Sequence, residues 1–169
     1  LTEEMIAQIC LETTGAEVRR PFPRLSYQEA MERFGTDKPD IRFGLEIKDI
    51  TDLVAGCAFK VFSAAVAAGG KVAGINAKGC GTFSRREIDE LTAFATGNKA
   101  RGLAYFFVEA GGVRSPIAKF FREEERKEIL ARLEAEEGDL LLFVADKPEV
   151  VFFALSALRL HLAERLGLV

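Results

Sequence analysis

The stretch from Phe22 to Arg42 constrains the fold more than any other part of the chain, because it joins a helix start to a proline-locked turn. Ser26 can cap a helix, and Glu29 follows three residues later, which is the spacing of a capping box. Gly35 then stands where a left-handed helix cap belongs. Pro39 has no amide proton and pushes the preceding residue toward extended backbone, so the helix cannot continue. The sequence therefore predicts a helix of about two turns followed by a fixed corner.

Composition places the chain among ordinary soluble domains. It has 169 residues, of which 49% are hydrophobic and 29% charged, enough for one domain with a substantial core. The net charge of −3 provides no overall positive field, so any contact with RNA must be local. Cys10, Cys57 and Cys80 are far apart and have no histidine nearby, which argues against a zinc site or a disulfide framework and favours a reduced, cytoplasmic setting. No apolar run is long enough to span a bilayer, and no membrane association is expected.

Hydrophobic periodicity predicts a mixture of helices and strands. Strands are expected at residues 45–47, 58–63, 71–76, 103–108 and 140–145, with the second and third paired as a hairpin. Helices are expected at residues 2–13, 26–34, 49–55, 84–96, 115–121, 123–137 and 146–166. Adjacent strands interrupted by helices predict an α+β fold. We expect a two-layer sandwich in which a mainly antiparallel sheet has helices packed on one face, preceded by a short helical flank.

Residues Arg24–Arg42, with the sequence RLSYQEAMERFGTDKPDIR, resemble the segment that follows the second class-defining motif in bacterial-type aspartyl-tRNA synthetases. The match covers about twenty positions, far more than a short chance motif. The rest of the chain resembles the insertion domain of that family, which is also found in the B subunit of the tRNA-dependent amidotransferase. The resemblance implies that residues 1–43 are a flanking segment from the class II catalytic domain, that 44–146 form the insertion domain, and that 147–169 form a helix returning to the catalytic domain. A start at Leu1 inside a helix, without methionine, is what an excised piece of a longer protein would have.

The resemblance also implies a parent enzyme, an aspartate–tRNA ligase of protein biosynthesis. Such an aminoacyl-tRNA synthetase binds ATP and Mg²⁺, activates aspartate as an aspartyl-adenylate and transfers it to tRNA, and the parent is expected to be a cytoplasmic homodimer. No segment of this chain matches the family's residues for ATP, aspartate or magnesium. We therefore expect the chain alone to hold no cofactor, to be monomeric and inactive, and to help position the tRNA acceptor arm in the full enzyme.

Two other functions are alternatives to this one. The tRNA-docking domain of the amidotransferase B subunit is the main alternative, although the segment through Arg42 is expected only in the synthetase. An independent small-molecule enzyme would need a convergent acid, base and nucleophile, which the sequence does not supply.

Four basic residues are candidate tRNA contacts: Lys38, Arg42, Arg85 and Arg86. Lys38 and Arg42 rank first, because a rigid Asp-Lys-Pro-Asp corner would present them to phosphates at fixed angles. Each of the four could also be ordinary exposed surface, which is the favoured interpretation for any single cluster. The acidic run at residues 123–128 is typical of a solvated helix face and argues against RNA lying along it. The same two interpretations apply to two further basic clusters, Arg19–Arg20 with Arg24, and Lys99 with Arg101.

Three other features have plainer interpretations. Gly79-x-Gly81-x-x-Ser84 before a helix is the one candidate phosphate cradle, but its third glycine is missing, so a loop and a helix cap are favoured. His161 has no second histidine or cysteine with which to bind a metal, and it is expected to be a packed structural residue. Ser115, before a proline, is interpreted as a helix cap and not as a nucleophile.

Overall fold

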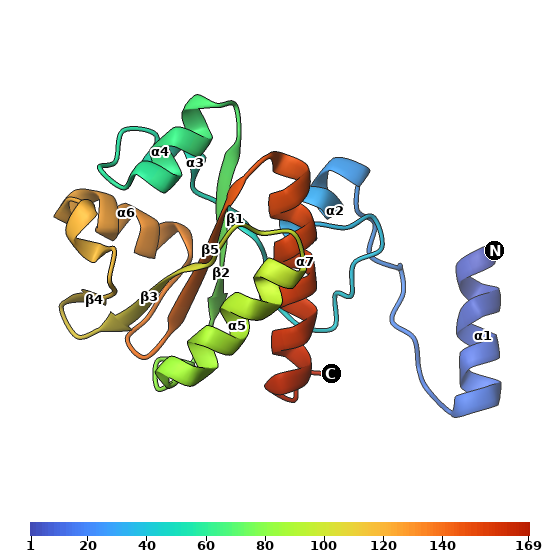
Figure 1. The fold of residues 1–169 in the computed structure, drawn as a ribbon. Coiled ribbons are helices and arrows are strands. Elements are labelled where there is room, and N and C mark those ends of the chain that lie inside the picture. Colours follow the sequence, from blue (N-terminus) through green and yellow to red (C-terminus); the bar gives the residue numbers. More distant parts are fainter.

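The structure, a computed structural model, describes all residues from 1 to 169 and is built around one five-stranded sheet (Figure 1). Every pair of neighbouring strands is antiparallel. The α+β class and the mainly antiparallel sheet predicted from the sequence are therefore confirmed. The spatial order of the strands is β1 (Lys48–Asp49), β2 (Lys71–Ala77), β5 (Leu140–Asp146), β3 (Ala104–Glu109) and β4 (Gly112–Arg114).

Helices cover both faces of the sheet (Figure 1). The pair α5 (Arg85–Gly97) and α7 (Pro148–Arg165) packs on one face. The other face is covered by α3 (Thr51–Val54), α4 (Lys60–Ala67) and α6 (Glu123–Arg132). This three-layer arrangement differs from the expected packing of helices on one face.

The apolar run in β5 explains the third layer. Leu140, Leu142 and Val144 belong to the core shared with α5 and α7, whereas Leu141 and Phe143 belong to the core on the opposite face. Successive residues of a strand point to opposite faces of a sheet. An unbroken apolar run must therefore be covered on both sides, and helices on one face would leave half of it in water.

Residues 58–63 do not form the expected strand, and the hairpin predicted with residues 71–76 is wrong. They contribute to α4, and β2 pairs instead with β1 and β5. Phe62 is 1% exposed and packs edge-on against Phe59, three residues earlier, while Val61 is 58% exposed. A spacing of three is helical, but a short apolar run does not distinguish helix from strand.

The other strands follow the sequence pattern with small shifts. The strands predicted at residues 103–108 and 140–145 correspond to β3 and β5. The strand expected at residues 45–47 is displaced to the two residues of β1. β4 was not predicted, and it forms a hairpin with β3 in which Val113 lies opposite Val108.

Helix caps are placed largely as predicted. The short helix α2 (Tyr27–Phe34) begins after Ser26, whose hydroxyl accepts a hydrogen bond from the Glu29 amide at 3.1 Å. It ends at Gly35, which has a φ of 72°. The Glu29 carboxylate does not return a bond to Ser26, because it accepts one from Arg33 at 2.7 Å.

Helix α5 also begins at its predicted residue. The capping box of α5 is complete, since Ser84 and Glu87 each accept a hydrogen bond from the other's amide at 3.3 and 2.7 Å. The helix expected at residues 115–121 is only a single 3-10 turn, η1 (Ala118–Phe120), whose N-cap residue is Ile117 and which has no side-chain cap. The predicted cap at Ser115 is therefore wrong, and its hydroxyl instead accepts from the Ile117 amide at 3.2 Å in the turn before η1. No helix in the structure has both the length and the apolar character required to cross a membrane.

The N-terminal helix α1 (Thr2–Thr14) stands apart from the rest of the molecule (Figure 1). It ends at Gly15 as predicted, but none of its residues is buried. Met5 and Ile9, on its apolar face, are 57% and 50% exposed. The helix touches only the linker that follows it, through Glu3, and so contributes nothing to the core.

Candidate nucleic-acid interface

The proline corner of residues 35–44, called the elbow below, lies against α7. Gly35 at its start has no side chain, and an added Cβ would meet the Phe152 carbonyl oxygen of α7 at 2.5 Å. Only glycine permits both this approach and the left-handed backbone of the cap. Near the other end of the elbow, Phe43 is buried at 9% exposure. The elbow is thus attached to α7 at both ends.

Arg159 of α7 holds the elbow with hydrogen bonds to its backbone. Its Nη2 donates to the carbonyl oxygens of Asp40, Phe43 and Gly44 at 2.7, 3.0 and 2.9 Å. Its guanidinium carbon lies 4.8 Å from the ring centre of Phe34 and 4.1 Å from that of Phe43. The side chain is 1% exposed. A planar guanidinium is well suited to this role because its donors are arranged in a fixed geometry.

The role of Arg159 was not predicted from the sequence. No carboxylate forms an ion pair with it, and burial lowers the pKa of its guanidinium, while the charges of Asp40 and Glu46 act in the opposite direction. The sequence offered one signal of its burial, since Arg159 directly follows Leu158 within the apolar part of a helix. Its partners are backbone carbonyls more than 100 positions away, at separations of 115 to 119 residues, and no local pattern identifies them.

Lys38 and Arg42, the leading candidates, are both exposed on the elbow. The guanidinium of Arg42 forms a two-point contact with Asp40, at 2.6 Å from Nη2 to Oδ2 and 3.0 Å from Nε to Oδ1. The hydrogen bond from Arg42 lowers the pKa of Asp40 to about 2. Lys38 forms no ion pair, and only its amide is engaged, with the Thr36 hydroxyl at 3.3 Å. Lys38 is therefore immediately available to a phosphate, whereas Arg42 must first exchange its carboxylate partner.

Arg85 and Arg86 are exposed in the first turn of α5. Arg86 donates to Glu90 at 3.1 Å, while the Arg85 side chain has no partner in the structure. The start of α5 is tied to the end of α7 by Arg165, which donates to Glu87 at 2.7 Å. Both candidate pairs thus lie on segments packed against α7, but no hydrogen bond or ion pair joins one pair to the other. Their role as tRNA contacts stays a prediction.

The Gly79–Gly81 loop does not have the geometry of a phosphate cradle. Its three amides donate to Asp139 Oδ1, the Ala77 carbonyl and the Gly138 carbonyl at 3.0, 3.2 and 2.7 Å. A Cβ on Gly81 would lie 2.6 Å from the Gly138 carbonyl oxygen. The glycine therefore allows two loops to touch, and the amides that would bind the phosphates of ATP already have acceptors.

The remaining candidates are packed side chains. His161 stacks on Phe94 with ring centres 4.1 Å apart and an angle of 16° between the ring planes. Cys57 and Cys80 are buried, and burial raises the pKa of both thiols. The structure contains no group of three or more histidine, cysteine, aspartate or glutamate side chains arranged to hold a metal ion.

An antiparallel sheet between two helical layers defines an α+β domain, and its elbow carries two cations, Lys38 and Arg42, together with two carboxylates, Asp37 and Asp40. The sequence profile of the GAD domain matches residues 62–155. The chain belongs to this family.

The whole chain is also similar to one segment of bacterial aspartate–tRNA(Asp/Asn) ligases. It is 57% identical over 169 residues to the ligase of Symbiobacterium thermophilum and 56% identical over 168 residues to that of Moorella thermoacetica, covering 99% of the chain each time. The ligase of Bacillus mycoides is 51% identical over 170 residues and covers the whole chain. The chain spans only 28% of the length of the first two relatives. The resemblance to a segment of a bacterial-type aspartyl-tRNA synthetase is confirmed, and because the matches include the residues before Phe43, they support the synthetase over the amidotransferase subunit.

Proposed function

We propose that the chain is the inserted domain, with its flanking helices, of an aspartate–tRNA ligase. The observation that carries this proposal is the 57% identity to the Symbiobacterium thermophilum ligase across 169 residues, a segment that makes up 28% of that protein. In this proposal the complete enzyme is a cytoplasmic homodimer that activates aspartate with ATP and Mg²⁺ and transfers it to tRNA. The relatives are named for both tRNA(Asp) and tRNA(Asn), which favours charging of both. The residues that bind ATP, Mg²⁺ and aspartate lie in the rest of the polypeptide.

Within that enzyme the domain positions the acceptor arm of tRNA and does not take part in the chemistry. The unpaired cations Lys38 and Arg85 support this role, because phosphate contacts supply most of the affinity for nucleic acid and position the bound strand. Arg159 keeps the elbow in one conformation, so that Lys38 is presented at a constant angle. We retain residues 1–43 as the catalytic flank, 44–146 as the insertion and 147–169 as the returning helix.

Pyrophosphate exchange tests the proposal that the catalytic residues lie outside this chain, in the rest of the enzyme. The purified 169-residue chain should catalyse no aspartate-dependent exchange of pyrophosphate into ATP and should charge no tRNA, whereas the full-length protein should do both. Exchange by the chain alone, at a rate proportional to its concentration, would refute the proposal that the chemistry resides elsewhere.

A double substitution tests the contact with tRNA. In the full-length enzyme, Lys38→Ala with Arg42→Ala should raise the KM for tRNA at least tenfold, since a charge-assisted hydrogen bond contributes about 1.5–3 kcal/mol. The kcat and the KM for aspartate should not change, because neither residue would touch the amino acid. Lys127→Ala is the matched control, as this lysine lies on the acidic helix α6 and pairs with Glu123 at 3.0 Å. An unchanged KM for tRNA would remove the elbow from the proposed interface.

A further inference from the structure

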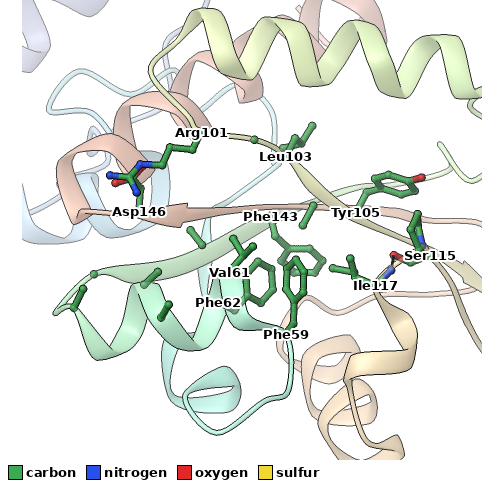
Figure 2. Close-up of a pocket in the computed structure, with 18 of the residues that line it drawn as sticks. Phe59, Val61, Phe62, Arg101, Leu103, Tyr105, Ser115, Ile117, Phe143 and Asp146 are labelled. Carbon is green, nitrogen blue, oxygen red and sulfur yellow. Dashed lines mark hydrogen bonds and ion pairs between the residues drawn. The ribbon is translucent and has the colours of Figure 1, made fainter.

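A concavity of the molecule lies away from the elbow, on the α4 side of the sheet. It has a volume of about 730 Å³, which is in the range of pockets that bind small molecules. Its floor is formed by Phe143 and Ala145 of β5 and Ala104 of β3. Figure 2 shows Phe62 pointing into this groove from α4 and Ile117 from the segment that leads to η1.

The wall formed by α4 is apolar although it faces solvent. Val61, Ala64 and Ala68 all line the groove and are all exposed, with Val61 at 58%. These positions are three and four residues apart and form one face of the helix. The exposed face of a surface helix usually carries polar side chains. Here it offers an apolar wall, and Ala104 of β3 packs on the same side of the sheet, whereas Leu103 and Tyr105 line the rim and pack against the core on the α5 side.

One end of the groove is cationic. Arg101 and Asp146 lie there together (Figure 2), and Lys147 is beside them. The Asp146 carboxylate is already engaged, since Oδ1 accepts from the Lys147 amide at 2.8 Å and Oδ2 lies 3.3 Å from Nε of Arg101. The Arg101 side chain is 84% exposed, and its terminal nitrogens make no hydrogen bond. Two cations and one occupied carboxylate leave this end with a net charge of +1.

The start of α7 adds a small contribution to this positive end. Pro148 is the first residue of the helix, so the N-terminal end of an 18-residue helix adjoins Lys147. The aligned peptide dipoles give a helix N-terminus a partial positive charge. At α7 this contribution is small, because Pro148 has no amide proton, the Val150 and Val151 amides donate to the Lys147 carbonyl, and Glu149 lies in the first turn. No acidic side chain other than Asp146 lines the groove.

We propose that this groove binds a small amphipathic anion, whose aliphatic or aromatic body lies between α4 and β3 and whose carboxylate or phosphate contacts Arg101. The apolar walls would bury the body, and the hydrophobic effect would supply most of the affinity. The charge at one end sets the orientation. This site is separate from the tRNA contacts proposed at Lys38, Arg42, Arg85 and Arg86, and its test does not depend on aminoacylation.

Isothermal titration of the 169-residue chain with dodecanoate tests the proposal, at ligand concentrations below micelle formation. We expect saturable binding of one molecule per chain. Dodecyl phosphate, titrated in parallel, distinguishes a phosphate site from a carboxylate site, and binding of either anion supports the proposal. Dodecylamine has the same body and the opposite charge and should bind at least tenfold more weakly. Absence of saturable binding by both anions, or equal binding of the amine, would overturn the proposal.

Paired variants locate the site within the chain. Ala64→Phe places a ring in the groove and should weaken binding at least tenfold, whereas Ala67→Phe, on the same helix at an exposed position outside the groove, should not. Arg101→Ala should weaken the anions about tenfold without affecting the amine, with Lys127→Ala as the control for net charge. Circular dichroism of each variant verifies that it is folded. Equal affinities for Ala64→Phe and Ala67→Phe would show that any bound anion lies elsewhere.

Discussion

Replacing Arg159 by methionine tests whether the elbow depends on one buried guanidinium. Methionine keeps a long, unbranched apolar side chain but donates no hydrogen bond. The substitution leaves the carbonyl oxygens of Asp40, Phe43 and Gly44 without their donor. It also removes the cation that packs between two phenylalanine rings.

The cost depends on which of these carbonyls can reach water. Gly44 is exposed and Asp40 half-buried, so their carbonyls can be rehydrated, whereas Phe43 is 9% exposed. A buried acceptor without a donor costs about 1–3 kcal/mol, and two cation–π contacts contribute about 1–4 kcal/mol together. Release of the guanidinium from its own buried position offsets part of that loss. We expect Arg159→Met to lower the free energy of unfolding by about 2–4 kcal/mol.

Urea unfolding followed by circular dichroism measures this change, and limited trypsinolysis locates it. The Lys38–Pro39 bond resists trypsin because proline follows the lysine, so cleavage after Arg42 reports on the elbow. Cleavage there should be faster in Arg159→Met than in the unchanged chain. Arg165→Met on the same helix is the matched control, because its partly exposed pairing with Glu87 is worth less than about 1 kcal/mol. If both variants have the same urea midpoint and equal protection at Arg42, the proposed role of Arg159 is wrong.

Three further predictions concern stability. Gly81→Ala should lower the free energy of unfolding by about 1–3 kcal/mol, because the new Cβ would lie 2.6 Å from the Gly138 carbonyl oxygen. The control Gly97→Ala, with open space around the new Cβ, should be neutral or stabilising, and the urea midpoints of the two variants measure the difference. Burial raises the pKa of Asp139, but hydrogen bonds from two backbone amides and an asparagine outweigh it and lower that pKa below its ordinary value. The stability due to this carboxylate is therefore present above about pH 4 and lost as pH falls further, so Asp139→Asn should reduce the difference in unfolding free energy between pH 7 and pH 3. Deleting residues 1–20 should change the urea midpoint little, because α1 buries no residue, and a large decrease in the midpoint would contradict the separation of α1 from the core.

Local signals predicted much of the fold and one part of the candidate site. The caps at Ser26 and Ser84, the left-handed Gly35 and the apolar run of β5 were all interpreted correctly from a few neighbouring residues. Lys38 was predicted to be exposed at a proline corner, and the structure places it there. These features depend on backbone conformation and capping within about one turn, which the adjacent residues control.

The predictions were wrong where contacts with distant segments determine the secondary structure or the packing of a segment. The alternation of apolar residues within 58–63 suggested a strand. In the structure Phe62 packs against the rings of Phe121 and Phe143, far along the chain, and only a helix places it there. The second helical layer was missed for the same reason. An apolar strand requires cover on both faces, but nothing in the strand itself identifies the helices that supply it.

The sequence by itself determined the α+β class, the positions of most helix ends, the proline corner and the resemblance to a synthetase segment, because each depends on short-range conformational preferences or on direct identity of residues. Only the tertiary structure decided that the Gly79–Gly81 loop packs against Gly138, that Arg42 is paired while Lys38 is not, and that Arg159 holds the elbow. Those contacts join residues up to 119 positions apart, and their energies depend on burial and geometry that exist only once the sheet and α7 have come together.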